Sequence, residues 1–334
     1  MITYAEVDKL RHLRTADPAV LSLYLWVSAD PAGQRVIEAR ADALIQESRH
    51  RVPDADRNAL AALLAARGRQ WPGRMVAIFA SGELGLLEAL VMPCRLHERA
   101  VFATSPHVLP LLTAMRRCPA YHAAIIDLRH GWLMSVAGDD TSVTRLPDTG
   151  VRRDPGSIAA SLEEAAGTGG PIVIGGHPDG IPKLLRMLTD QVRAQYAGSF
   201  AADPHALTPE RARQLADPVV ADWVRRSERR LADELSSGQP GVAAGLETCL
   251  IAVNNGAVST LAVADDQMIA GFVCGRCGAL SVTGDDCPDW GTAARPVPDL
   301  LEEMACRVLD DGGEVVAVRN AGFEVAARLR FALT

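Results

Sequence analysis

Apolar runs of strand length alternate with stretches of helical periodicity through the first third of the chain. MVAIFAS at 75–81 is typical of a buried strand, because it is a short apolar run bounded by Gly73 and Gly82. Strands are expected at 19–28, 75–81, 87–92 and 99–104, and helices at 32–50, 54–70 and 105–118. This pattern predicts an α/β domain over residues 1–118.

A second alternating region follows. HAAIIDL and GWLMSVAG flank Arg129-His130, which is typical of a hairpin, and PIVIGG at 171–176 reads as a buried strand that runs into a glycine turn. Strands are expected at 122–128, 131–138, 143–147 and 171–176, and helices at 158–166 and 181–192. This region is predicted to form a middle α/β domain over residues 119–239.

The boundary to the last domain is marked by the linker Ser-Ser-Gly-Gln-Pro at 236–240, which follows a long helix expected at about 218–236. Thr208-Pro209 also supplies a helix start, with an N-cap residue before proline at the first helical position. Beyond the linker, helices and strands alternate, which predicts a three-layer α/β/α domain over residues 240–334. Its helices are expected at 246–255 and 299–313, and its strands at 257–264, 314–320 and 325–333.

Three cysteines in this last domain have most of the spacing of a zinc ribbon. Cys274-x-x-Cys277 is separated by nine residues from Cys287-x-x-Trp290, and a ribbon needs two such pairs so that four ligands surround one tetrahedral metal. Trp290 stands where the fourth thiolate is expected. A bound zinc would need an oxygen ligand from a nearby carboxylate, Asp285, Asp286 or Asp289. The favoured interpretation is a degenerate ribbon held by packing, with a three-thiolate zinc site as the alternative.

Composition and charge limit the function classes. The chain has 334 residues, of which 34 are basic and 41 acidic. Residues 240–334 hold 6 of the basic and 13 of the acidic residues, so residues 1–239 hold 28 of each. A general nucleic-acid coat shows a basic excess, so any RNA contact must come from local arginine patches.

The sequence also predicts where the protein acts. No apolar run is long enough to span a bilayer, and the start of the chain has no signal-peptide core. Seven cysteines without such a signal favour a reducing, cytoplasmic setting.

Four segments of the last domain resemble the C-terminal domain of archaeo-eukaryotic peptide chain release factors and of Pelota. They are Gly245–Thr248, Ala252–Val258, Leu300–Glu303 and Arg328–Phe331. Many members of that family carry a cysteine ribbon at this place. The first two domains match by their order and strand pattern. The resemblance implies the family's three-domain order, a middle domain with a mixed sheet of ribonuclease-H-like type, and the bacterial branch that includes ribosome hibernation factors such as Balon.

The motifs that carry release-factor chemistry are missing from the sequence. The family hydrolyses peptidyl-tRNA with a Gly-Gly-Gln loop, which positions a water and stabilises the developing oxyanion, and this chain has no Gly-Gly-Gln. The matching region 150–157 contains Arg-Arg-Asp-Pro instead. Arg51–Asp54 stands in the place of the stop-codon motif. A protein without release chemistry or codon decoding is therefore predicted.

Two groups of arginines are the candidates for contact with RNA or the ribosome. One group lies in the loop that replaces Gly-Gly-Gln, and the other recurs at i and i+4 on one predicted helix. They are Arg152, Arg153, Arg225, Arg226, Arg229 and Arg230. The alternative for the second group is a solvated, ion-paired face, because Asp222, Glu228 and Asp233 lie on the same helix.

The sequence predicts a non-catalytic, release-factor-like protein that binds the ribosome or tRNA-like surfaces in translation stress, hibernation or rescue. The direct partner on the ribosome would be rRNA, tRNA or a ribosomal protein. No cofactor is expected, and a bound zinc is the alternative that the cysteine spacing allows. Two alternatives stay open. A hydrolase or nuclease could use His177 and Asp179, which lie between a strand and a helix, where α/β proteins often bind ligands. The acidic C-terminal domain could instead serve as a protein-interaction scaffold.

Overall fold

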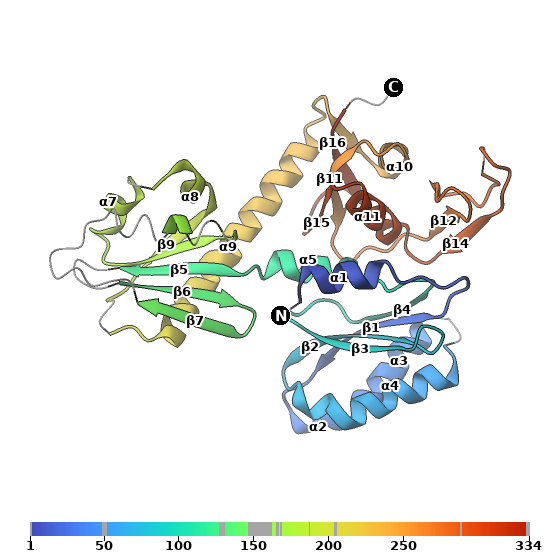
Figure 1. Cartoon of the computed structure of the whole chain (residues 1–334), viewed down its shortest axis with the longest axis horizontal. Coiled ribbons are helices and arrows are strands. Elements are labelled where there is room, and N and C mark those ends of the chain that lie inside the picture. Colours follow the sequence, from blue (N-terminus) through green and yellow to red (C-terminus); the bar gives the residue numbers. More distant parts are fainter. Residues whose placement is uncertain are drawn as a thin grey trace. The chain divides into compact units, whose positions relative to one another are not determined.

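The chain is a mixed α/β protein with several sheets, as the sequence predicts (Figure 1). It divides into two compact units, residues 117–227 and residues 2–116 with 228–334. Helix α9 (Pro209–Ser236) belongs to both units. No helix in the described part of the chain is long and apolar enough to cross a membrane. The computed structural model describes residues 2–48, 52–126, 131–145, 162–164, 167, 169–186, 188–203, 206–287 and 289–331.

The larger unit begins with an antiparallel sheet in the order β3-β2-β1-β4. Its strands are β1 (Val20–Val27), β2 (Arg74–Ser81), β3 (Leu86–Met92) and β4 (Arg99–Ala103). Successive strand residues point to opposite faces, so Val76 and Ile78 join the core beneath helices α3 (Ile37–Glu47) and α4 (Asp54–Arg67). Ala77 and Phe79 join the core on the other side. The apolar run that predicts β2 is buried on both faces.

Short helices surround this sheet. They are α1 (Tyr4–Arg11), α2 (Pro31–Arg35), α3 (Ile37–Glu47), α4 (Asp54–Arg67), the 3-10 turn η1 (Gly68–Gln70) and α5 (Leu109–Arg117). The helix predicted at 32–50 is therefore two helices that meet at Val36, whose φ of −106° and ψ of 11° interrupt the helical path. The helix predicted at 105–118 begins only at Leu109.

A second sheet of the same unit has the order β10-β16-β11-β15. Its strands are β10 (Val242–Ala244), β11 (Val258–Ala264), β15 (Glu314–Val318) and β16 (Val325–Leu329). Strands β11 and β15 are parallel, and the other pairs are antiparallel. Helices α10 (Leu246–Asn254) and α11 (Leu300–Asp310) contribute to the core on one face, and the end of α9 packs on the other through Leu231 and Leu235.

One apolar core joins these two sheets. Phe79 from the first sheet, Leu111 from α5, Val263 from the second sheet and Met304 from α11 belong to the same buried cluster. The regions predicted as the first and third domains thus share a core within the larger unit. The boundaries of the three domains stay a prediction.

The smaller unit contains a five-stranded mixed sheet in the order β7-β6-β5-β8-β9. Its strands are β5 (Tyr121–Ile126), β6 (Gly131–Ala137), β7 (Asp140–Arg145), β8 (Ile172–Gly176) and β9 (Tyr196–Ala201). Strands β5, β6 and β7 are antiparallel, whereas β5, β8 and β9 are parallel. Helix α9 covers one face, and α7 (Ile181–Leu185) and α8 (Asp190–Gln195) contribute to the core on the other.

Three features differ from the prediction. Strand β9 was not expected, the helix predicted at 181–192 is split into α7 and α8, and the long helix expected from about 218 begins at Pro209, with Pro218 inside it. The helix start predicted at Thr208-Pro209 is confirmed, because Pro209 is the first residue of α9 and the Thr208 hydroxyl accepts a hydrogen bond from Arg211 N at 3.3 Å. The ribonuclease-H-like type of the sheet stays a prediction, and most of the helix predicted at 158–166 lies outside the described residues.

The glycine pair at the end of β8 is explained by packing. A Cβ on Gly175 would lie 2.4 Å from the Phe200 ring, and a Cβ on Gly176, whose φ is +156°, would lie 2.2 Å from the Ile126 carbonyl oxygen. Both distances are too short for a real contact. The close approach of β8 to its neighbours β9 and β5 therefore accounts for both glycines.

We expect Gly176→Ala to destabilise the smaller unit by about 1–3 kcal/mol, because the new methyl group must displace backbone rather than a flexible side chain. Gly180→Ala is the matched control, since its Cβ would lie 3.4 Å from the His177 carbonyl oxygen, in ordinary van der Waals range. Urea unfolding midpoints of the two variants and the wild type measure the difference. Equal midpoints for all three would contradict the close approach of β8 to β5.

Candidate functional site

The three cysteines of the predicted ribbon meet beside a small sheet of the larger unit. This sheet consists of β12 (Gly271–Cys274), β13 (Leu280–Ser281) and β14 (Ala294–Val297), in the order β13-β12-β14. The sulfurs of Cys274, Cys277 and Cys287 all lie within 4.8 Å of one another. The Cys277 and Cys287 sulfurs are 3.5 Å apart. The spacing in the sequence thus correctly predicts a three-cysteine cluster.

Two similar backbone turns bring the sulfurs together. Gly278 N donates to the Cys274 carbonyl at 2.9 Å, and Gly291 N donates to the Cys287 carbonyl at 2.7 Å. Each glycine closes its turn at a positive φ, +72° for Gly278 and +58° for Gly291, where a side chain would be strained. The second turn therefore has the same backbone form as the first, although Trp290 stands where a second cysteine was expected.

Backbone amides also surround the first sulfur. Arg276 N approaches the Cys274 sulfur at 3.4 Å. Hydrogen bonds from the backbone N–H groups of Cys277 and Arg276 stabilise the thiolate and lower the pKa of Cys274 to about 7.

Trp290, at the position of the expected fourth ligand, stacks against an arginine. The Arg276 guanidinium carbon lies 3.9 Å from the centre of the Trp290 ring, and the tryptophan is 50% exposed. This geometry is a cation–π contact. Among the described residues, the cluster that could hold a metal contains only the three cysteines, so the carboxylates predicted as oxygen ligands, Asp285, Asp286 and Asp289, are not part of it. The three thiols can hold an ion such as zinc, but they supply only three of the four ligands of a closed structural site.

Two of the predicted arginines on α9 share one acidic partner. Arg225 and Arg226 are exposed and both form ion pairs with Asp222, the first at 3.2 Å. Glu228, which was expected on the same ion-paired face, forms no ion pair with Arg225 or Arg226. It is buried and accepts two hydrogen bonds from Arg319, of 2.8 and 3.0 Å.

The other four arginines predicted to contact RNA lie partly on α9 and partly outside the described residues. Arg229 and Arg230 are exposed on α9. Arg152 and Arg153 lie outside the described residues. RNA or ribosome contact by these side chains stays a prediction.

His177 and Asp179 form a local pair in the turn after β8. Their side chains are 72% and 87% exposed, and His177 Nδ1 lies 3.6 Å from an Asp179 carboxylate oxygen. Catalytic groups are usually tuned by burial and by charged neighbours in a cleft. This exposed pair has no such burial, so the geometry does not favour a hydrolase centred on it.

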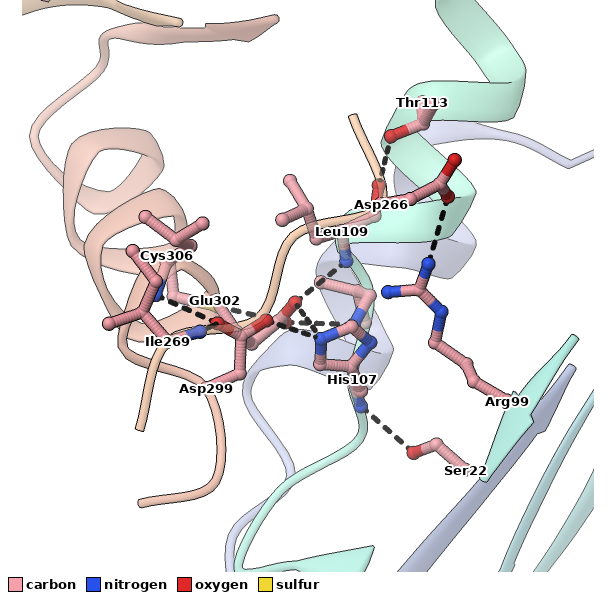
Figure 2. A network of polar contacts seen from close by, with 12 residues as sticks. Ser22, Arg99, His107, Leu109, Thr113, Asp266, Ile269, Asp299, Glu302 and Cys306 are labelled. Atoms are coloured by element: carbon pink, nitrogen blue, oxygen red, sulfur yellow. Dashed lines mark hydrogen bonds and ion pairs between the residues drawn. The ribbon is translucent and has the colours of Figure 1, made fainter. Parts of the chain in front are cut away.

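A buried polar network in the larger unit was not predicted from the sequence (Figure 2). His107 Nε2 lies 2.9 Å from an Asp299 carboxylate oxygen and 3.6 Å from Glu302. The Glu302 carboxylate accepts hydrogen bonds of 2.8 Å from both Val108 N and Leu109 N, at the start of α5. His107, Asp299 and Glu302 are only 2%, 2% and 5% exposed. The network therefore links the segment before α5 to the start of α11.

Asp299 and the backbone of His107 form further hydrogen bonds, with α11 and with β1. Asp299 is the N-cap of α11, with its side chain accepting from Leu301 N at 3.0 Å. His107 N donates to the Ser22 hydroxyl at 2.9 Å, and the Tyr24 hydroxyl donates to the His107 carbonyl at 2.5 Å. Sequence reasoning could have found the cap from the position of Asp299 before the helix. No local signal points to the partners of Glu302, because they lie 193 and 194 residues away.

The pKa shifts in the network follow from burial and close charges. Burial by itself would lower the pKa of His107, but Glu302 and Asp299 outweigh it, so the pKa is raised. Burial raises the pKa of Glu302 against the opposing effects of His107 and two backbone N–H groups. Because the groups bind one another and are closed to solvent, the arrangement supports a structural role.

Comparisons with known proteins found similar chains only among solved structures. No protein-family model and no curated protein matches the chain. A model of ribosome-bound archaeal Pelota with ABCE1 has a matching chain with 16% identity and a TM-score of 0.45, covering 99% of this chain and 95% of that one. Dom34 of S. cerevisiae has 10% identity and a TM-score of 0.44, covering 78% and 80%. Pelota of Archaeoglobus fulgidus has 16% identity and a TM-score of 0.34, covering 78% and 81%. At these identities and TM-scores the matches assign neither family nor function.

We expect Glu302→Ala to destabilise the larger unit by about 3 kcal/mol or more, because it leaves two buried N–H groups and His107 without their acceptor. Glu314→Ala is the control, since Glu314 is 67% exposed and pairs with Arg116 at 3.6 Å. Removing such a surface pair costs about 0–1 kcal/mol. Urea unfolding of both variants tests the difference, and similar losses of stability would show that the buried carboxylate is unimportant.

The raised pKa of His107 gives the stability a definite pH dependence. The folded state holds the proton more tightly than the unfolded state, so this contribution is complete below pH 6.5 and is lost as pH rises through the folded pKa. The raised pKa of Glu302 acts in the same direction above pH 4.5. We therefore expect the contribution of this network to the free energy of unfolding to fall as pH rises above 6.5.

The control for this pH dependence is a second histidine. His107→Gln should reduce the fall, whereas His177→Gln, at an exposed position, should leave it as in the wild type. Urea unfolding at several pH values gives the three slopes. A wild-type slope in His107→Gln would contradict the assignment.

Proposed function

We propose that this chain is a release-factor-like protein of translation that binds the ribosome or tRNA-like surfaces without catalysing peptide release. It would belong to the bacterial branch of the release factor and Pelota family and act in the cytoplasm during hibernation, rescue or another translation stress. Its partner would be rRNA, tRNA or a ribosomal protein. The cysteine segment would be a degenerate zinc ribbon of that family.

The observation that carries this proposal is the spatial arrangement of the release-factor-like segments. Gly245–Thr248 leads into α10, and Ala252–Val258 runs from α10 into β11. Leu300–Glu303 begins α11, and Arg328–Phe331 includes the end of β16, which pairs with β11. Segments that are far apart in the sequence thus build one sheet and its two helices. This supports a family-like domain more strongly than separate short matches would.

One glycine in these segments has a clear conformational reason. Gly256 follows the end of α10 at a φ of +64°, and its position lets Ala257 N donate to the Ala252 carbonyl at 2.9 Å. Such a left-handed residue ends a helix and redirects the chain into the next strand. The Gly-Ala-Val part of the resemblance therefore has a structural cause.

The charges on α9 support local rather than general RNA binding. Arg225 and Arg226 share the single carboxylate of Asp222, and Glu228 is occupied by Arg319. This stretch of the helix therefore keeps a positive excess although the whole chain carries a net charge of −7. Phosphate groups are a suitable partner for such exposed guanidinium groups.

We expect the full chain to co-sediment with ribosomes from resting cells at low and moderate salt. The double variant Arg225→Glu/Arg229→Glu should bind about tenfold more weakly and with a smaller salt dependence, because phosphate contacts release counterions. Arg35→Glu is the matched control, since Arg35 is also an exposed arginine on a helix.

Three outcomes would contradict these proposals. Absence of ribosome binding by the wild type would contradict the proposed function, and an equal loss of ribosome affinity in the double variant and in Arg35→Glu would contradict the α9 surface. Peptide release from peptidyl-tRNA on addition of the protein would contradict a non-catalytic role.

A further inference from the structure

The cysteine cluster contains sulfur atoms that are close enough to react with one another. Cys277 and Cys287 lie in different turns, yet their sulfurs are 3.5 Å apart. Cys277 is half-buried, whereas Cys274 and Cys287 are 3% and 5% exposed. One member of the closest pair can therefore meet a small solute, and the other is shielded behind it.

The cluster is also poorly suited to hold a metal as a closed site. Three thiols are present, and Trp290, at the place of the fourth ligand, stacks against Arg276. A tetrahedral ion bound here would need a ligand from outside the cluster. Without such an ion, three adjacent thiols remain available for oxidation.

We propose that Cys277 and Cys287 form a redox pair, which a hydroperoxide oxidises to a disulfide that joins the two turns. The chemical class of the co-reactant is a small hydroperoxide such as hydrogen peroxide. This modification site is independent of the proposed binding to the ribosome.

The reaction balances in two steps. A cysteine thiolate of the cluster attacks the peroxide oxygen, the O–O bond breaks, and a sulfenic acid and hydroxide form. A neighbouring thiol then attacks the sulfenic sulfur, the S–S bond forms, and water leaves. Overall, two thiols lose two electrons and two protons, and hydrogen peroxide becomes two molecules of water. If Cys274 reacts first, thiol–disulfide exchange transfers the bond to the pair whose sulfurs lie closest.

The structural consequence is a covalent link in place of a metal. In a ribbon, the metal holds two turns together, and here a bond between Cys277 and Cys287 would do the same. Gly278 and Gly291 close these two turns at positive φ, and the turns already bring the Cys277 and Cys287 sulfurs to 3.5 Å. Reduction would release the link, so the segment 274–291 would differ in rigidity between the two redox states.

The experiment uses the full chain, reduced, treated with EDTA and then exposed to hydrogen peroxide. Acid quenching, unfolding and alkylation reveal the free thiols by mass spectrometry. We expect the number of alkylated cysteines to fall from seven to five, because two of the seven cysteines pair. The peptide that contains both Cys277 and Cys287 should be lighter by two hydrogen atoms and should escape alkylation until a reductant is added.

Variants and alternative outcomes make the test specific. Cys277→Ser should lose this product, whereas Cys94→Ser, at another half-buried cysteine, should keep it. Peptide mapping of the wild type gives a decision even if Cys277→Ser fails to fold. The proposal is overturned by seven alkylated cysteines after peroxide, by a bond between Cys274 and Cys277, or by irreversible sulfinic acid without a disulfide. It is equally overturned by one zinc per chain that survives EDTA and prevents oxidation.

Discussion

The larger unit depends on one buried carboxylate. Glu302 accepts the N–H groups of Val108 and Leu109, which lie 194 and 193 residues away in the sequence. A buried charge is costly unless hydrogen bonds and an opposite charge compensate it, so the start of α5 has to stay where this carboxylate lies. Asp299 caps α11 and binds His107, while Ser22 and Tyr24 bind the backbone of His107. The polar contacts thereby fix which part of the first sheet faces which part of α11.

Apolar packing around this network then makes the segments 2–116 and 228–334 one compact body. The apolar core supplies attraction without direction, because burial of hydrophobic area depends little on orientation. The carboxylate network supplies direction, because each of its hydrogen bonds has a fixed donor and acceptor. The unit of residues 117–227 has separate cores on the two faces of its own sheet. The segments Gly245–Thr248, Ala252–Val258, Leu300–Glu303 and Arg328–Phe331 therefore lie in a body that also contains the N-terminal sheet.

The sequence predicts what local patterns determine. Strands β1, β2 and β11 follow from apolar runs, and the cysteine cluster follows from the Cys-x-x-Cys spacing and two glycine turns. Strand β9 was missed because YAGSFA contains a glycine and no continuous apolar run. The split between α7 and α8 was missed because the apolar residues continue at helical spacing across the break. The pairing of Glu302 with the start of α5 could not be inferred, since a carboxylate at the beginning of a helix is equally typical of an ordinary first-turn residue.

The carboxylate network and the cysteine cluster of the larger unit differ in how many of their polar atoms have hydrogen-bond partners within the protein. In the carboxylate network, both oxygens of Glu302 bind backbone N–H groups and both oxygens of Asp299 have partners, so the two carboxylates have little capacity to bind a ligand. His107 Nδ1 has no hydrogen-bond partner among the described residues. In the cysteine cluster, the Cys277 and Cys287 sulfurs lie 3.5 Å apart, and backbone N–H groups of Arg276 and Cys277 approach the Cys274 sulfur. Sulfur can gain stability there by binding a metal or by forming a bond to another sulfur. Because only three thiols are present and Trp290 stacks against Arg276, a closed metal site needs a further ligand, whereas a disulfide needs only two of the thiols and a hydroperoxide as the oxidant.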